Sequence, residues 1–406
     1  MTAGPLEAAP AGAQRGLSAY ASLLRLPETA RLLSGALIGR MQIGMASLAI
    51  LLVVHGSTGS FADAGLAVGV FGAVGAGFTP VLGRLIDRVG QVAVLVVCGV
   101  ACPVAFVALA FGARHGASFG ELLGVAAVAG AALPPLASCM RALWPTLAPE
   151  PHLREAAYML DAISQELIWT LGPLLVAVLV AVWSASIALL VCAVLTAIGT
   201  AIFATSPVTR DWRPEARHPS WLGPLSSRRI LILLVCVAIA SLAVGICQVA
   251  IPAIAVRAGS SASAGVLLGV WSVGSMLGAI AFGTVHWRAA MERRYAALSL
   301  AIAAATVPLI VCGSIPAGIV CAFVCGLPLA AWISCQYTLV SDAAPPGTLT
   351  EAFAWNAAAG FGAVALGAAA GGWLISTFGL HWSFAVAVTI GAGAAVVANA
   401  FVRSQR

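Results

Sequence analysis

Twelve long apolar segments constrain the fold of this chain more than any other feature of its sequence. Each has about 20 residues, enough for an α-helix to cross the roughly 30 Å hydrocarbon core of a bilayer. The segments lie at approximately 32–54, 63–82, 92–112, 119–142, 157–182, 185–205, 230–253, 263–284, 296–313, 316–339, 351–377 and 381–402. A lipid-facing backbone has no water to pair its amides, so every segment must be helical. We therefore predict an all-α polytopic membrane protein with 12 transmembrane helices.

Composition excludes the soluble alternatives. Only 8% of the 406 residues are charged and 61% are hydrophobic, whereas roughly 25% of residues are charged in a typical soluble protein. So few charges cannot cover a water-exposed surface. A soluble enzyme, a nucleic-acid-binding protein and a disordered regulator are excluded on this ground, and we expect the lipid bilayer, not nucleic acid, to be a partner.

The arginines predict the orientation of the helices. All 20 basic residues are arginine, and with both termini inside, the outer loops hold only Arg114 and Arg257. Arg40 and Arg141 lie within predicted spans, which leaves 16 arginines in the inner segments. Since positively charged loops stay in the cytoplasm, we expect both termini to be cytoplasmic. The predicted location is a bacterial plasma membrane.

A polar, arginine-rich stretch at 206–229 follows the sixth span and divides the chain. It resembles a cytoplasmic linker that lies against anionic lipid. The expected layout is as follows: a cytoplasmic N-terminal tail at 1–31, a six-helix bundle at 32–205, the linker at 206–229, a second six-helix bundle at 230–402, and a cytoplasmic C-terminus at 403–406.

The two halves repeat one another. A shift of 200 residues places Ala64-Gly65 on Ala264-Gly265 and Gly83 on Gly283. A shift of 196 residues places Glu155-Ala156 on Glu351-Ala352. Such matches at helix ends indicate duplication of a six-helix unit. Two parallel halves with a binding site between them are a transporter architecture, so we expect two pseudo-symmetric six-helix bundles.

The segment GRLIDRVGQ at 83–91 resembles the G-x-L-x-D-R-x-G-R/K signature of the major facilitator superfamily, although Gln91 replaces the last basic residue. The resemblance covers nearly the whole chain from about residue 30. It implies a conformational latch, formed by this inner loop, that joins the two halves in the outward-facing state. The latch residues would be Gly83, Asp87, Arg88 and Gly90.

The second half departs from this signature. Only Gly283 matches it, and Trp287 stands where the aspartate would be. We therefore expect the latch to be one-sided.

Gly172 and Pro173, in the outer part of the fifth span, resemble a signature of the family's proton-coupled exporters. Proline removes a backbone hydrogen bond and glycine admits a close neighbour, so a kink is expected here. The resemblance implies that the kink seals the outer interface. Leu174-Leu175-Val176 follows in place of the signature's further glycines, but the pair favours export.

Four charged residues lie inside predicted spans of the first half: Arg40, Arg141, Asp161 and Glu166. Isolated charges in a membrane are costly, so pairing is expected. One interpretation is a fixed ion-pair cluster that holds the first half together. The other is that a carboxylate exchanges a proton as the protein changes conformation, and Glu166 is favoured over Asp161 because it lies deeper.

Amide and aromatic side chains offer a wall for a substrate cavity. The candidates are Gln42, Gln165, Trp169, Gln248, Trp271, Trp332, Gln336, Tyr337, Trp355 and Asn356. They suit a bulky, mostly apolar or weakly polar molecule, although each tryptophan could instead anchor the membrane interface or pack between helices. No cluster of buried basic residues indicates a phosphate-rich substrate.

We therefore expect a secondary active transporter that exports a small amphipathic molecule by alternating access, driven by the proton gradient. The alternatives are an uptake symporter or uniporter of the same fold, and a non-transporting membrane sensor or scaffold. An enzyme is not expected, because nucleotide-binding and catalytic motifs are absent from the sequence. The ten cysteines lie in apolar stretches without histidine, so neither a metal site nor another cofactor is predicted. We expect a monomer.

Overall fold

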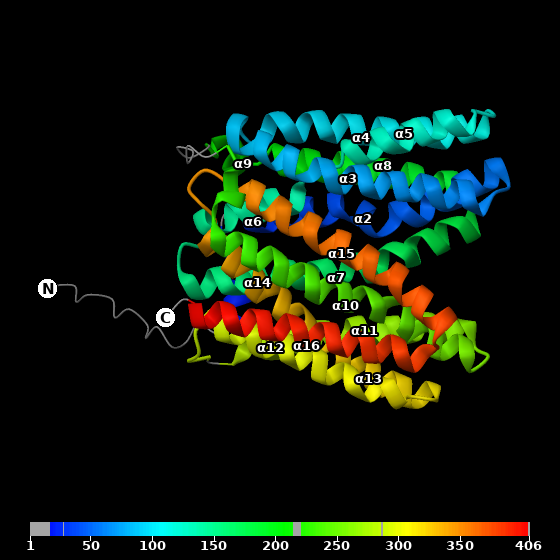
Figure 1. Ribbon diagram of the computed structural model, residues 1–406. Helices are drawn as coiled ribbons and strands as arrows, with labels where there is room; N and C mark the ends of the chain where they lie inside the picture. The colour runs from blue at the N-terminus through cyan, green and yellow to red at the C-terminus, as the bar shows by residue number, and fades with distance from the viewer. Residues whose placement is uncertain (1–16, 27, 214–220, 286, 405–406) are drawn as a thin grey trace, which may run out of the picture.

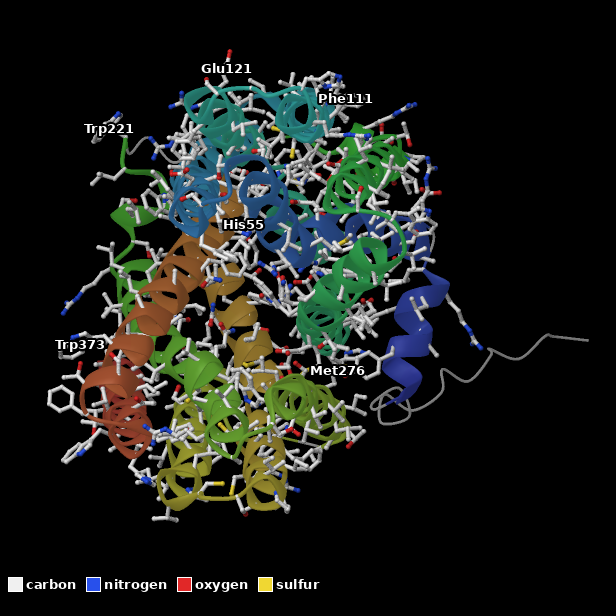
Figure 2. All side chains as sticks on the ribbon, turned by 90° about the vertical axis from the view of Figure 1, so that its right-hand side faces the viewer. His55, Phe111, Glu121, Trp221, Met276 and Trp373 are labelled. Atoms are coloured by element: carbon white, nitrogen blue, oxygen red, sulfur yellow. The ribbon has the colours of Figure 1, made fainter. Side chains whose placement is uncertain are left out.

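The computed structural model describes residues 17–26, 28–213, 221–285 and 287–404, and within these residues the chain is helical and contains no strand. Twelve helical spans are long and apolar enough to cross a membrane, which confirms the predicted number. They form two six-helix bundles that lie side by side (Figure 1). Figure 2, which looks along the helices, shows the first bundle above and the second below.

The first bundle consists of α2 to α8 and is preceded by a short helix, α1. The bounds are α1 Leu17–Arg25, α2 Thr29–Thr58, α3 Phe61–Val89, α4 Gln91–Arg114, α5 Phe119–Ala131, α6 Leu136–Leu147, α7 Pro151–Val182 and α8 Ala185–Ala204. The connecting segment contains α9 Pro207–Asp211 and the 3₁₀ helix η1 Gly223–Ser226. The second bundle consists of α10 Arg228–Arg257, α11 Ser261–Thr284, α12 Met291–Thr306, η2 Val307–Val311, α13 Ile315–Gly326, α14 Leu329–Ala343, α15 Leu349–Thr377 and α16 Leu380–Ser404.

The fourth span of each bundle is interrupted near its middle, which differs from the continuous helices predicted. The first interruption separates α5 from α6 at Pro134 and Pro135, and the second separates α13 from α14 at Leu327 and Pro328. Proline lacks the amide hydrogen that a helix needs and clashes with the preceding turn. The interruptions occupy corresponding places in the two bundles, so they belong to the repeated unit.

Both ends of the described chain lie at the same end of the molecule (Figure 1), which we call the termini end; the opposite end is the far end. Arg114 and Arg257 end α4 and α10 at the far end. The placement agrees with an even number of crossings and with the unequal distribution of arginine. By the positive-inside rule, the termini end is expected to be cytoplasmic.

Helix α1 lies within the predicted N-terminal tail and was not expected. It packs against α7 and α2, with Leu23 fully buried. Tyr20 reaches the second bundle, because a Cβ added at Gly283 of α11 would lie 2.5 Å from the Tyr20 hydroxyl. Burial raises the pKa of this phenol above its usual value. The first span begins at Thr29, so the tail is partly helical and contacts both bundles.

Candidate functional site

A cavity of about 160 Å³ lies between the bundles and is lined by α6, α7, α10, α11, α14 and α15. Eight of the predicted cavity residues line it: Gln165, Trp169, Gln248, Trp271, Trp332, Gln336, Tyr337 and Asn356. Arg141 and Glu166, predicted as charged groups, also line it. The first bundle therefore supplies a charged wall, whereas the second supplies amides and aromatic rings.

Two predicted cavity residues lie elsewhere. Among the described residues that line the cavity, none belongs to α2, so Gln42 is buried away from it, and its Oε1 atom has no hydrogen-bond partner. Trp355 lies in α15 directly before Asn356, and each residue turns a helix by about 100°. The cavity-lining residues of α15 are Asn356, Ala357, Gly360, Phe361 and Val364. Trp355 falls outside this face.

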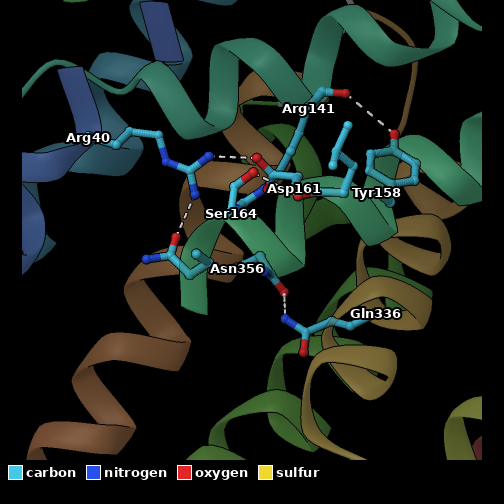
Figure 3. Close-up of polar contacts among 9 residues, drawn as sticks. Arg40, Arg141, Tyr158, Asp161, Ser164, Gln336 and Asn356 are labelled. Carbon is cyan, nitrogen blue, oxygen red and sulfur yellow. Dashed lines mark hydrogen bonds and ion pairs between the residues drawn. The ribbon is translucent and has the colours of Figure 1, made fainter. Parts of the chain in front are cut away.

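Asp161 is shared by two arginines in the interior of the first bundle (Figure 3). Nη1 of Arg40 donates to one carboxylate oxygen at 2.6 Å, and Nε of Arg141 donates to the other at 2.7 Å. Arg40 also donates to Oε1 of Gln165 at 2.6 Å, and Gln165 lies one helical turn after Asp161 on α7. All three charged side chains are buried. Such charge-assisted bonds fix α2, α6 and α7 relative to one another.

Glu166 is not part of this cluster, which corrects the expectation that the four buried charges would pair together. No ion pair is recorded for Glu166 in the part of the chain that the structure describes, and its carboxyl group lies close enough to Ser275 of α11 to interact with the hydroxyl group. Successive residues of a helix point about 100° apart. Asp161 and Gln165 can therefore face α2 while Glu166 faces the second bundle.

The second bundle's side of the cavity, which we call the neutral wall, contains an amide pair and polar atoms that have no hydrogen-bond partner among the described residues. Nε2 of Gln336 donates to Oδ1 of Asn356 at 2.7 Å, joining α14 to α15 (Figure 3). Nε1 of Trp332 donates to Ser299 at 2.9 Å. Among the described residues, Oε1 of Gln336 and Nε1 of Trp271 are buried without a partner. Buried polar atoms without partners are costly, so a bound molecule could satisfy both.

The cavity is closed more firmly toward the termini end than toward the far end. Toward the termini end, the rings of Tyr158, Tyr337 and Phe353 meet across the bundle interface with centroids 5.9 to 6.3 Å apart. Toward the far end, Trp169 of α7 meets Phe361 of α15 at 6.1 Å, and both rings are 43% exposed. The contact toward the termini end is buried and involves three rings, whereas the contact toward the far end involves two rings that are partly exposed.

The predicted latch residues join the bundles at the termini end. The carboxylate of Asp87 accepts hydrogen bonds from the backbone amides of Thr350 and Glu351, at 3.2 and 2.8 Å, in the first turn of α15. These amides lack partners within their own helix, so Asp87 caps a helix of the opposite bundle. Arg84 donates twice to Oε1 of Glu351, at 2.9 and 2.5 Å.

Two glycines of the latch have different roles. A Cβ added at Gly83 would lie 2.8 Å from Cβ of Ala354, so α3 and α15 approach too closely there for a side chain. Gly90 ends α3 at φ +97°, a conformation that favours glycine. Arg88 is exposed, and no ion pair is recorded for it within the described ranges. Its role in the latch remains a prediction.

The second bundle also reaches across, so the expectation of a one-sided latch is wrong. Arg294 of α12 donates to Glu155 of α7 at 2.9 Å. Glu155 corresponds to Glu351 under the shift of 196 residues. No second Asp87 supports this contact, because Trp287 replaces it, and Tyr20 lies over Gly283. The glutamates of the two contacts thus correspond under the repeat, but the arginines do not, because a shift of 200 residues places Arg84 on Thr284.

Gly172 packs inside the first bundle. A Cβ added there would lie 2.6 Å from the backbone of Gly44 in α2, and one at Gly199 of α8 would lie 2.1 Å from the backbone of Gly39. Helix α7 continues through Pro173 up to Val182. The role of Gly172 and Pro173 in sealing the outer interface remains a prediction.

Sequence reasoning missed several of these groups. Arg84 was assigned only to a basic loop, and Ser275, Tyr158 and Phe353 were not singled out. The repeat contained a usable signal, because Glu155 and Glu351 coincide at the starts of corresponding helices. Nothing in the sequence indicated which arginines would meet which carboxylate.

Comparison with known proteins agrees with this architecture. Solved structures of similar fold include a bacterial homologue of the iron transporter ferroportin in its outward-facing state, with 17% identity, 92% of this chain and 98% of that chain covered, and a TM-score of 0.73. The human organic anion transporter MFSD10 matches with 15% identity, coverage of 91% and 98%, and a TM-score of 0.69. The fucose:proton symporter of E. coli matches with 14% identity, coverage of 92% and 98%, and a TM-score of 0.68. At these identities the likeness shows the fold alone.

No match was found among curated proteins at the level of sequence. The model of the Major Facilitator Superfamily, however, matches residues 32–347 and 233–406, which together span nearly the whole chain. The matched region includes both bundles and both contacts at the termini end. The chain therefore belongs to the Major Facilitator Superfamily.

Proposed function

We propose that the protein is a secondary active transporter that moves a small amphipathic molecule across a bacterial plasma membrane by alternating access, coupled to protons and in the direction of export. It would act as a monomer with both termini in the cytoplasm. The twelve-helix fold and the cavity between the bundles support transport, and the Gly172-Pro173 pair favours export.

One observation carries the proton coupling: Glu166 is a buried carboxyl group that lies in the cavity and contacts the opposite bundle. When the bundles move apart, Glu166 loses Ser275 and meets water. Burial, hydrogen bonding and nearby charge all set the proton affinity of a carboxyl group. The movement that exposes the cavity would therefore also change whether Glu166 holds a proton.

Transport in proteoliposomes tests this proposal. A thermal-shift panel of matched neutral, anionic and cationic aromatic compounds would select the strongest stabiliser as the transported probe. An imposed pH gradient should drive its movement, and a trapped pH dye should report protons moving in the opposite direction. Protons moving with the probe would indicate symport, and no proton movement would indicate uniport.

Glu166→Gln should reduce gradient-driven transport at least tenfold while leaving the melting temperature nearly unchanged. The matched control is Glu150→Gln, because Glu150 is exposed at the start of α7 and its side chain forms no cap. Full proton dependence in Glu166→Gln would show that Glu166 has no coupling role. Absence of transport for every stabilising compound would contradict the proposed function itself.

A further inference from the structure

The ion-pair cluster behind the cavity, formed by Arg40, Arg141 and Asp161, carries more positive than negative charge. Arg40 and Arg141 share the single carboxylate of Asp161, so these three buried groups sum to one positive charge. An unbalanced charge buried in the membrane interior is unfavourable. While Glu166 of the same cavity holds a proton, a singly charged anion would balance this charge, whereas a doubly charged phosphate would exceed it.

Arg141 is the member of the cluster that faces the cavity. Its Nε is bound to Asp161, and its guanidinium carbon lies 3.8 Å from the centroid of the Tyr337 ring. In the described part of the chain, no hydrogen bond is recorded for its two terminal nitrogens. A guanidinium presents its donors in a fork that matches a carboxylate, so Arg141 retains donors for a ligand.

Further unpartnered donors lie in the same cavity. Nε2 of Gln165 and Nε1 of Trp271 are buried, and neither has a hydrogen-bond partner among the described residues. Both need an acceptor, as a carboxylate or sulfonate oxygen would provide. The remaining unpartnered atom, Oε1 of Gln336, needs a donor such as a hydroxyl or amide on the ligand.

We propose that the transported molecule is an aromatic or otherwise apolar organic monoanion. Its acidic group binds at Arg141, and its apolar body lies against Trp271 of the second bundle and the Trp169–Phe361 pair. This inference rests on the proposed transport function and adds the charge of the substrate. An inside-negative membrane potential favours outward movement of an anion, which agrees with export.

Three ligands with the same ring system test the charge preference: 2-naphthoate, 2-naphthamide and 2-naphthylmethylamine. Calorimetric titration of the full-length protein in nanodiscs should show 2-naphthoate binding at least tenfold more tightly than 2-naphthamide, because its contact with Arg141 is charge-assisted. The amine should bind most weakly of the three.

Variants of Arg141 locate the preference. Arg141→Gln should reduce it to less than threefold, and this variant should fold because Arg40 and Asp161 remain a balanced pair. Arg141→Lys should keep most of it. The matched control is Arg114→Gln, an exposed arginine at the far end of α4, which should bind all three ligands as the parent protein does.

Two results would overturn the proposal. Equal binding of 2-naphthoate and 2-naphthamide by the parent protein would exclude a charge-selective site. Tightest binding of the amine, lost in Glu166→Gln, would instead assign a cation site at Glu166. Either result would leave the transport function standing. Tight 2-naphthoate binding without transport of any probe in proteoliposomes would instead contradict the transport function and support the anion site.

Discussion

The two bundles have the same arrangement of helices but line the cavity with different kinds of side chain. Both interrupt the fourth span at proline, and both begin the fifth span beside a glutamate, Glu155 in the first bundle and Glu351 in the second. Of the described cavity-lining residues, however, only those of the first bundle include an arginine or a carboxylate. Duplication has therefore preserved the helix geometry, while charge in the described lining of the cavity is confined to one half. The neutral half can move past the charged half without carrying an unpaired charge.

The largest expected effect comes from removing Asp161, the centre of the buried ion-pair cluster with Arg40 and Arg141. Asp161→Asn leaves Arg40 and Arg141 buried without a counter-ion, and breaking a buried ion pair on one side costs about 3–5 kcal/mol. We expect a strong loss of folded protein, measured by fluorescence size-exclusion chromatography and thermal melting. Asp211→Asn, at an exposed position outside the spans, is the control. Unchanged folding of Asp161→Asn would mean that the buried ion-pair cluster does not hold the first bundle together.

The next effect compares the two contacts at the termini end. Glu351 is 1% exposed and bound twice by Arg84, whereas Glu155 is 41% exposed. Hydrogen bonds to buried charged groups contribute about 1.5–3 kcal/mol, and exposed ion pairs contribute about 0.2–1 kcal/mol. Arg84→Gln should therefore lower the melting temperature more than Arg294→Gln. Equal shifts would indicate that the two contacts have become equivalent despite the missing aspartate.

The neutral wall should respond through its amide pair. Asn356→Leu leaves Gln336 without its partner, and an unsatisfied buried polar group costs about 1–3 kcal/mol. The double variant Gln336→Leu with Asn356→Leu should be less destabilised than the sum of the two single variants, because both polar groups are gone. Thermal melting of the four proteins measures this coupling, and simple additivity would show that the pair is not energetically linked.

The smallest effect is expected at the far-end ring contact. Trp169→Ala removes a half-exposed aromatic pair, which is worth about 0.5–1.5 kcal/mol beyond its buried area. Melting should change little, but ligand binding should weaken because the apolar body of the ligand loses one wall. A Trp183→Ala variant, exposed at the end of α7, controls for loss of a membrane-interface tryptophan. Equal binding losses in both variants would remove Trp169 from the cavity's function.

The global fold could be predicted because its determinants are local in sequence. Apolar length gives the spans, arginine placement gives an orientation, and the matches of Gly83 with Gly283 and Glu155 with Glu351 reveal the duplication. The helix interruption at Pro134 and Pro135 could have been predicted from the two prolines, but hydropathy alone does not distinguish an interrupted span from a continuous one. Two adjacent prolines cannot continue a helix.

The site could be predicted only in part, because it depends on which helix faces which. The spacing of four residues between Asp161 and Gln165 puts both on one face of α7, where both contact Arg40, but it does not show that α2 supplies the partner. Helix rotation about its axis, which separates Glu166 from that face and Gln42 from the cavity, is set by packing between spans. The family signature likewise gave Asp87 as a latch residue, but not the helix that it caps.

The glycine contacts of α2 have a consequence for how the protein can change shape. At Gly44 and Gly39, the backbone of α2 touches α7 and α8 directly at two separate heights. These two backbone contacts prevent α2, α7 and α8 from sliding or rotating past one another. Arg40 of α2 and Asp161 of α7 therefore move together as parts of one rigid body. The ion pair of Arg40 with Asp161 therefore stays intact throughout the proposed transport cycle, and only its surroundings alternate.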